Sequence, residues 1–337
     1  MNKKSIYIAY TGGTIGMKHS SQGYIPVSGY LQQQLLKMPE FNRSEMPEFT
    51  IHEYSPLIDS SDMTPEDWQR IANDIRDNYD SYDGFIILHG TDTMAFTASA
   101  LSFMLENLTK PIIVTGSQIP LAELRSDGQT NLLNALYIAA NYSVNEVTLF
   151  FNNKLLRGNR ATKAHADGFE AFTSPNFPLL LEAGIHIKRL PYSSFPVYGN
   201  TLHVATITPQ PIGVVTLYPG ISADIVRNFL LQPVKALILR TYGIGNAPQD
   251  AALLNELKQA TERGIIVINL TQCISGRVNM TGYATGHALT RAGVISGADM
   301  TLEATLTKLH YLLSQSLDYQ QIVTLMQKNL RGELTEE

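Results

Sequence analysis

The sequence predicts an α/β protein of two domains, with a larger N-terminal doubly wound, mainly parallel sheet and a smaller C-terminal Rossmann-like parallel sheet. Short runs rich in Ile, Val and Leu alternate with amphipathic segments, which is the pattern of parallel strands covered by helices on both faces. The alternation lapses between about Leu190 and Pro211, where Pro, Ser, Tyr, Asn and Gly dominate. A chain of 337 residues, 44% of them apolar, can bury more than one core. We therefore expect a first domain over residues 1–190, a linker over 191–211 and a second α/β domain over 212–337.

The expected strands are the short apolar runs, at Ser5–Tyr10, Phe85–Leu88, Ile112–Thr115, Val147–Phe151, Gly213–Leu217, Ala236–Leu239 and Ile265–Leu270. The segments between them predict helices, at Pro65–Asn78, Ala95–Leu108, Gln129–Asn141, Ser222–Leu230, Gln249–Arg263 and Leu302–Leu313. The sequence Thr64-Pro65-Glu66-Asp67 is typical of a helix start, because Pro suits the first turn and acidic side chains favour the positive end of the helix dipole.

Composition and charge exclude several classes of function. The 30 acidic residues exceed the 25 basic ones, and no cluster of Lys or Arg interleaves with aromatics, so we expect no nucleic-acid partner. No apolar stretch approaches the ~20 residues that a membrane helix needs, and the apolar run at the N-terminus is a first strand rather than a secretory signal. The single Cys273 excludes an internal disulfide and suits a reducing compartment. These features predict a cytoplasmic protein that does not bind membranes.

The eight histidines give no sign of a metal site. None of them stands in His-x-x-x-His spacing or beside the cysteine, and a cysteine-rich zinc site is excluded because there is one cysteine. We therefore expect no metal site.

Residues that follow the strands directly are the candidates for chemistry, because ligands of doubly wound sheets bind beyond the carboxyl ends of the strands. The segments in this position are Thr11–Gly16, His89–Thr93, Thr115–Gln118 and Arg160–Lys163. Their glycines let a backbone approach a ligand closely and free the following amides to bind an oxyanion. The glycine spacing of the first segment, Thr11–Gly16, matches no nucleotide-binding loop. The structural alternative for this segment is a tight turn that happens to contain hydroxyl residues.

The second and fourth segments contain a possible proton relay. A Thr hydroxyl is a weak nucleophile unless a base is near, and Thr91 with Asp92 and Lys163 would supply a hydroxyl, a carboxylate and an amine. Two structural alternatives stay open: Asp92 could cap the helix that begins near Met94, and Lys163 could be a solvated surface lysine.

Two further segments could hold and enclose a substrate. Asp59-Ser60-Ser61 could be the turn before the Pro65 helix, or it could bind an amino acid, since a carboxylate accepts from an α-ammonium and hydroxyls donate to an α-carboxylate. The segment from Lys18 to Tyr30 is rich in Gly and Ser, so we expect no regular structure there and interpret Tyr24 as part of a mobile lid.

Together, Thr11-Gly12-Gly13-Thr14-Ile15 and His89-Gly90-Thr91-Asp92-Thr93 resemble the paired motifs of the bacterial L-asparaginase and glutaminase family. The resemblance spans essentially the whole chain, and two motifs in this order are highly specific. The form of Asp59-Ser60-Ser61 and the absence of a signal peptide are closest to the cytoplasmic, type I branch. The resemblance implies conversion of L-asparagine to L-aspartate and ammonia through a threonine acyl-enzyme, with no cofactor.

The family resemblance also implies a role for each matching residue. Thr14 would be the nucleophile, with Tyr24 as the lid residue hydrogen-bonded to it, and the second catalytic cluster would be Thr91, Asp92 and Lys163. The substrate-binding residues would be Asp59, Ser60, Ser61, Thr91 and Asp92, with Ser117 near the side-chain amide. Both threonines match the motif, so the sequence leaves open which one attacks first.

The family further implies a homo-oligomer, with a dimer of dimers expected. In secreted members a neighbouring subunit supplies an Asn and an acidic residue to the site. The corresponding segments here are Gly245–Pro248 and Val278–Met280, and the second contains no acid. Whether a neighbouring subunit completes the site therefore stays open.

A second ligand site is expected at the edge of the C-terminal sheet. Arg240 and Thr271-Gln272-Cys273 end adjacent expected strands, and Thr162 lies beside Lys163 in sequence. Type I enzymes that resemble this chain can be activated by asparagine, so an effector site with Thr162, Arg240, Thr271 and Cys273 is our hypothesis. Alternatively, Arg240 pairs with an acid at a subunit interface.

Three rival functions remain at this stage. Glutaminase activity and an amidase that supplies ammonia to a tRNA-charging complex use similar chemistry, and the lack of an appended domain in this sequence disfavours the complex. A nucleotide or amino-acid sensor on a Rossmann-like sheet would be favoured only if the threonines proved inert.

Overall fold

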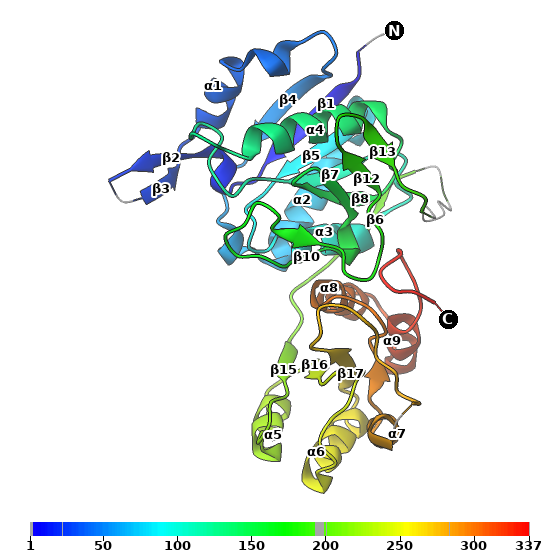
Figure 1. The fold of residues 1–337 in the computed structure, drawn as a ribbon. Helices are drawn as coiled ribbons and strands as arrows, with labels where there is room; N and C mark the ends of the chain where they lie inside the picture. The colour runs from blue at the N-terminus through cyan, green and yellow to red at the C-terminus, as the bar shows by residue number, and fades with distance from the viewer. Residues whose placement is uncertain (1–2, 22, 193–198, 200, 283, 337) are drawn as a thin grey trace. The chain divides into compact units, whose positions relative to one another are not determined.

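The computed structural model describes residues 3–21, 23–192, 199, 201–282 and 284–336 (Figure 1). The chain divides into two compact units, residues 1–205 and 206–337. The division falls inside the expected linker, 191–211, of which residues 193–198 and 200 lie outside the described residues.

The first unit is built on an eight-stranded mixed sheet in the order β13-β12-β9-β8-β7-β5-β1-β4. Its parallel core comprises β1 (Ser5–Tyr10), β4 (Glu48–Glu53), β5 (Gly84–Leu88), β7 (Ile112–Thr115) and β8 (Val147–Phe151). At one end β9 (Lys154–Arg157), β12 (Leu181–Ala183) and β13 (Ile187–Arg189) continue the sheet as antiparallel strands. The predicted fold class is confirmed, with these antiparallel strands added to the parallel core.

Helices cover both faces of this sheet, as Figure 1 shows. The helices are α1 (Tyr30–Leu36), α2 (Pro65–Asn78), α3 (Met94–Met104) and α4 (Gly128–Asn141). Alternate residues of β1, Ile6, Ile8 and Tyr10, share a buried core with α1 and α4, while α2 and α3 lie on the other face. Helix α2 begins where the sequence predicted, because Thr64 and Asp67 cap it reciprocally.

Two predictions for the first unit are wrong in detail. The segment expected to be irregular forms a hairpin of β2 (Met17–Ser20) and β3 (Gly23–Pro26), which Gly23 permits by taking a φ of 98°. The helix expected to run to Leu108 ends at Met104, because β6 (Leu105–Glu106) pairs with β14 (His203–Val204).

The second unit is a four-stranded parallel sheet with helices on both faces. The strands are β15 (Ile212–Thr216), β16 (Ala236–Thr241), β17 (Ile266–Thr271) and β18 (Ile295–Ser296), in that order. One core packs the sheet against α5 (Ala223–Leu231), α6 (Ala251–Glu262) and α7 (Ala284–Arg291). The other packs it against α8 (Leu302–Leu313) and α9 (Tyr319–Met326). This arrangement confirms the predicted parallel C-terminal sheet.

A buried ion pair fastens the C-terminal segment to α8. Lys308 Nζ lies 2.5 Å from Glu333 Oε1, and both side chains are fully buried. The ammonium also donates to the carbonyls of Met326 and Lys328, while Glu333 accepts from the backbone N–H of Leu330. Each charge is therefore matched by several partners.

The helices in the described part of the chain are all too short or too polar to cross a membrane.

Candidate active site

The loops that carry the candidate residues meet at one edge of the first sheet. Strands β4, β1, β5 and β7 are parallel neighbours, so the segments that follow them emerge on the same side. Thr14 begins a short 3-10 helix, Thr14–Gly16, and is half-buried. The parallel topology thus gathers Thr14, the Asp59 loop, Thr91 and Ser117 from separate parts of the sequence.

Glycines allow these loops to touch backbone to backbone. A Cβ on Gly12 would lie 2.1 Å from the carbonyl oxygen of Ile58, and one on Gly13 would lie 2.4 Å from the nitrogen of Gly90. A Cβ on Gly90 would lie 2.4 Å from Ser60 Oγ. Gly12 and Gly13 also have φ values of 144° and 92°, which favour glycine. No other residue type fits these contacts without displacing the loops.

Lys163 joins Thr91 and Asp92 in a hydrogen-bonded cluster. Its Nζ lies 3.0 Å from Thr91 Oγ1 and 2.7 Å from Asp92 Oδ1. The Lys163 side chain is 20% exposed, so it is not the solvated surface lysine of the alternative interpretation. The N-cap of α3 is Thr93, and Asp92 bonds to the lysine. The strand β10 (Thr162–Lys163), paired with β11 (Phe172–Thr173), holds the lysine in place.

Gln118 is a further residue that contacts Thr91, and the sequence assigned it no role. The Thr91 hydroxyl donates to Gln118 Oε1 at 3.1 Å. The side-chain amide of Gln118 donates in turn to the carbonyls of Ala166 and Gly168, at 3.2 and 3.0 Å. The Thr91 oxygen therefore accepts from Lys163 and donates to Gln118. The only signal for Gln118 in the sequence was its place after the third strand.

The Asp59 loop lies against the same edge. Asp59 accepts hydrogen bonds of 2.9 Å from both the backbone N–H and the hydroxyl of Ser61, which closes a tight turn. Ser60 is buried, and its carbonyl accepts from Thr93 Oγ1 at 2.6 Å. Ser117 is buried as well, and its hydroxyl has no partner among the described residues.

The structure does not bring Tyr24, which was expected to be catalytic, to this cluster. It lies in β3, is 46% exposed, and packs edge-on against His19 with ring centroids 5.5 Å apart. Among the described residues it has no hydrogen bond to Thr14. The β2–β3 hairpin projects from the body of the first unit (Figure 1).

Metal ligands do not gather at this edge or elsewhere in the described ranges: no three His, Cys, Asp or Glu side chains are grouped to hold an ion. The chemistry available to the cluster is that of hydroxyls, a carboxylate, an amine and backbone amides. That set suits acyl transfer.

Comparison with known proteins agrees with this geometry. Residues 5–192 match the family described as Asparaginase, N-terminal, and residues 211–326 match the Glutaminase/Asparaginase C-terminal domain. The chain is 76% identical to L-asparaginase 1 of Escherichia coli strain K12 over 335 residues, which cover 99% of both chains. The chain belongs to the asparaginase family. The resemblance inferred from the two motifs is confirmed.

Solved structures of the asparaginase family share the whole fold. The crystal structure of L-asparaginase I from Vibrio cholerae has a TM-score of 0.93 and 66% identity, and covers 99% of this chain and 100% of that one. The thermostable L-asparaginase from Thermococcus kodakarensis has a TM-score of 0.90 and 31% identity, with the same coverage.

The residues expected to bind an effector fall in both units of this asparaginase-family chain. Thr162 belongs to the first unit, and Arg240, Thr271 and Cys273 belong to the second. Arg240 pairs in register with Leu270, and the Cys273 N–H donates to Thr271 Oγ1 at 3.1 Å, so these three lie at one sheet edge. Within the described residues, Arg240 Nε is buried without a hydrogen-bond partner.

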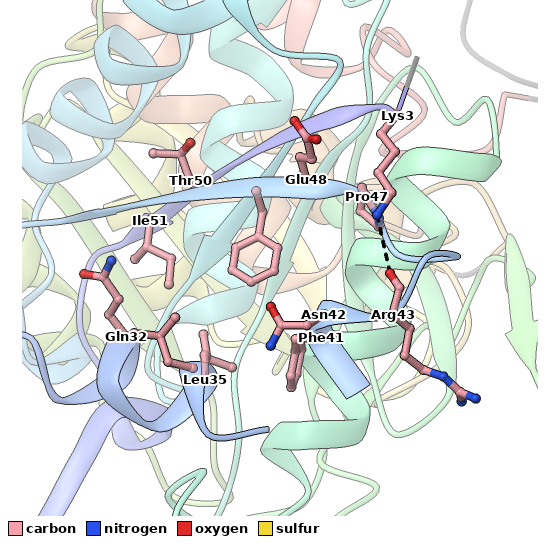
Figure 2. Close-up of a pocket in the computed structure, with 12 residues that line it drawn as sticks. Lys3, Gln32, Leu35, Phe41, Asn42, Arg43, Pro47, Glu48, Thr50 and Ile51 are labelled. Carbon is pink, nitrogen blue, oxygen red and sulfur yellow. Dashed lines mark hydrogen bonds between the residues drawn. The ribbon is translucent and has the colours of Figure 1, made fainter. Parts of the chain in front are cut away.

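A cavity of about 420 Å³ lies elsewhere in the first unit, between the edge strand β4 and the α1 segment (Figure 2). Its lining includes the apolar side chains of Leu35, Phe41 and Ile51, and Lys3 and Arg43 lie together at one end (Figure 2). The exposed Thr50 is the only hydroxyl residue among those that line it. Neither Thr14 nor Thr91 lines the cavity, so it is separate from the cluster of Thr91, Asp92 and Lys163.

Proposed function

We propose that this chain hydrolyses L-asparagine to L-aspartate and ammonia by double displacement on threonine. The observation that supports this most strongly is the contact of Lys163 with both Thr91 and Asp92, at a sheet edge whose glycines bring the Thr14 loop against the Gly90 loop. These are the hydroxyls, base and amides that amide cleavage through an acyl-enzyme requires.

In the proposed reaction, the Thr14 hydroxyl attacks the amide carbon of the substrate. Backbone N–H groups of the Gly13 and Gly90 loops stabilise the oxyanion, the C–N bond breaks, and ammonia leaves with the proton of the hydroxyl. Water activated near Thr91 and Lys163 then attacks the aspartyl ester, which releases aspartate and restores the hydroxyl. No cofactor takes part.

The substrate's two charged groups need partners of opposite sign. We assign Asp59 and Asp92 to the α-ammonium, and Ser60 with Ser61 to the α-carboxylate. The exposed carboxylate of Asp92 is available to a ligand, because its side chain is 63% exposed while it contacts Lys163. Ser117, buried and without a partner among the described residues, is assigned to the side-chain amide.

Tyr24 is assigned to a lid formed by the β2–β3 hairpin. Its exposed ring is free to move toward Thr14 when substrate binds, which would exclude water from the acyl-enzyme.

We expect asparagine to be preferred over glutamine by at least about 10²-fold in kcat/KM, because misplacing a reacting carbon by about 1 Å costs this much. The site fixes the α-carboxylate and α-ammonium at one separation from the nucleophile, and one extra methylene moves the amide carbon beyond it. Ammonia release measured with both substrates tests this expectation. Comparable kcat/KM values would contradict it and favour a general glutaminase-asparaginase.

The assembly is proposed to be a cytoplasmic homo-oligomer, a dimer of dimers. The second unit leaves Tyr218, Phe229 and Leu231 substantially exposed, which suits pairing with another copy. Light scattering at micromolar concentration should give about four times the chain mass of 37.3 kDa. A single species at the chain mass would refute the assembly.

We propose that Arg240, with Thr271 and Cys273, binds the carboxylate of a second asparagine. The buried Nε without a partner supports a ligand for Arg240. The rate should depend sigmoidally on asparagine concentration, and Arg240→Ala should make the curve hyperbolic or abolish the activation. Arg227→Ala, which removes an arginine paired with Glu256 in the same unit, is the control. Hyperbolic kinetics in the unmodified protein, with one asparagine bound per chain in calorimetry, would leave Arg240 a structural residue.

A further inference from the structure

The imidazole of His89 is completely buried next to Thr91, yet the proposed reaction does not use it. His89 follows β5 directly, and its backbone N–H donates to the Thr115 carbonyl at 3.0 Å. Its side chain is therefore fixed from an ordered strand end rather than from a mobile loop. A buried histidine in this place needs partners for both ring nitrogens.

Both ring nitrogens have such partners, and the partners determine which nitrogen donates a hydrogen bond and which accepts one. His89 Nδ1 lies 2.7 Å from the Gly90 carbonyl oxygen, and Nε2 lies 2.8 Å from Thr97 Oγ1. Trp68 Nε1 donates to the same Thr97 oxygen at 3.1 Å. Because a carbonyl only accepts, Nδ1 must carry the hydrogen, and in a neutral ring Nε2 then accepts from Thr97.

The ring is neutral at ordinary pH. Desolvation by burial lowers the pKa of His89 from 6.5 to about 4, outweighing the opposing effects of the Gly90 carbonyl and of Asp67. No carboxylate bonds to either nitrogen among the described residues. The Nδ1–H tautomer is thus present throughout the range in which an amide hydrolase would work at neutral pH.

The bond to Gly90 fixes the peptide that leads into Thr91. In a planar trans peptide the C=O and the N–H point in opposite directions. Because the Gly90 carbonyl is turned toward the buried imidazole, the N–H of Thr91 is turned to the other side. Glycine alone would not hold this plane, since its backbone adopts many conformations.

Gly90 is also packed closely against two other loops of the site, those of Ser60 and Gly13. A Cβ on Gly90 would lie against Ser60 Oγ, and a Cβ on Gly13 would lie against the nitrogen and Cα of Gly90. A rotation of the Gly90–Thr91 peptide would therefore disturb the contact with the Thr14 loop and move the Thr91 amide.

We propose that His89 is a positioning residue, whose Nδ1–H holds the Gly90 carbonyl and so directs the Thr91 N–H toward the oxyanion formed on the substrate amide. The proposal rests on the role proposed above for the Thr91 loop. It gives the histidine of the His-Gly-Thr-Asp-Thr motif a function that involves no proton transfer.

Two isosteric variants separate the two sides of the ring. In His89→Asn the side-chain amide nitrogen takes the place of Nδ1 and keeps the donor to Gly90, whereas His89→Gln places its amide at the Nε2 end and loses that donor. We expect His89→Gln to lower kcat by about 10²-fold, the cost of one misdirected oxyanion donor, with KM changed less than about threefold. His89→Asn should retain kcat within about tenfold of the unmodified protein.

Equal losses of kcat in the two variants, or full kcat in folded His89→Gln, would overturn the proposal. His310→Gln, at a histidine buried in the second unit, is the matched control and should lower stability without lowering kcat. If Thr91→Ala remained active, the proposed role of Thr91 would fail, whereas an inactive Thr91→Ala with a fully active His89→Gln would refute only the positioning role.

A measurement on the unmodified protein covers the case in which neither variant folds. With ¹⁵N-labelled histidine rings, one imidazole should show a protonated Nδ1 and an unprotonated Nε2, unchanged between pH 8 and pH 6. The absence of such a ring from the spectrum would overturn the proposal.

Discussion

Thr14→Ala and Thr91→Ala are each expected to lower asparagine turnover by at least about 10⁴-fold, the usual scale for loss of a nucleophile or its activating partner. Thr14→Ala removes the attacking oxygen. Thr91→Ala removes the hydroxyl that is hydrogen-bonded to both Lys163 and Gln118. Ammonia release by purified protein measures the effect.

The fold should survive both substitutions, because each removes a small polar group at a sheet edge. Lys163→Met should be inactive as well, since it removes the only amine in contact with Thr91 among the described residues. Thr50→Ala, an exposed threonine on β4, is the control and should behave like the unmodified protein. Turnover within tenfold of the unmodified protein in either Thr14→Ala or Thr91→Ala would refute the assignment.

Glu333→Gln and Lys308→Met are each expected to lower the free energy of unfolding of the protein by about 3–5 kcal/mol. Both side chains are fully buried, so either change leaves an unpaired charge in a dry environment. Burial lowers the pKa of Lys308 and the Glu333 carboxylate opposes that shift. Denaturant unfolding, with the assembly state held constant, measures the loss.

The double variant Lys308→Met, Glu333→Leu should recover much of this loss, because it removes both charges together. Lys258→Met is the matched control, since Lys258 forms an exposed pair with Glu262 at 3.8 Å, and it should cost less than about 1 kcal/mol. Single variants as stable as this control would show that the buried pair does not fasten the C-terminal segment.

The central parallel strands of both sheets could be predicted from the sequence, because each of them is a continuous apolar run. Ile6–Tyr10 and Phe85–Leu88 are buried almost completely, as central parallel strands should be. Once the strand ends were known, the rule that parallel loops share an edge placed Thr14 near Thr91. The agreement of strand pattern, helix caps and motif positions made the prediction consistent at every level.

The features that could not be predicted, such as strand β4 and the role of Gln118, depend on contacts between segments that are distant in the sequence. Strand β4 is an edge strand whose residues alternate between exposed and partly buried, so it lacks the apolar run of a core strand. Gln118 acquires its role from carbonyls about 50 positions away along the chain, at Ala166 and Gly168. Local patterns contain no information of this kind.

Burial of polar groups was the other feature that the sequence did not reveal. The spacing of the histidines speaks only against a metal site, whereas packing against α2 and α3 places His89 in a hydrogen-bonded chain with Thr97 and Trp68. Lys308 and Glu333 would be expected at the surface from their residue type, and tertiary packing buries both.

The central claim is that a threonine at this glycine-lined edge carries the acyl group, and the direct test is to trap it. Thr91→Val, which keeps Thr14 but removes the hydroxyl proposed to help activate water, is mixed with asparagine, quenched in acid and mapped by peptide mass spectrometry. The account predicts an aspartyl ester on the peptide that contains Thr14, formed together with one equivalent of ammonia per site. Ammonia released without any ester on that peptide, or an ester on Ser60 or Ser117 instead, would contradict it.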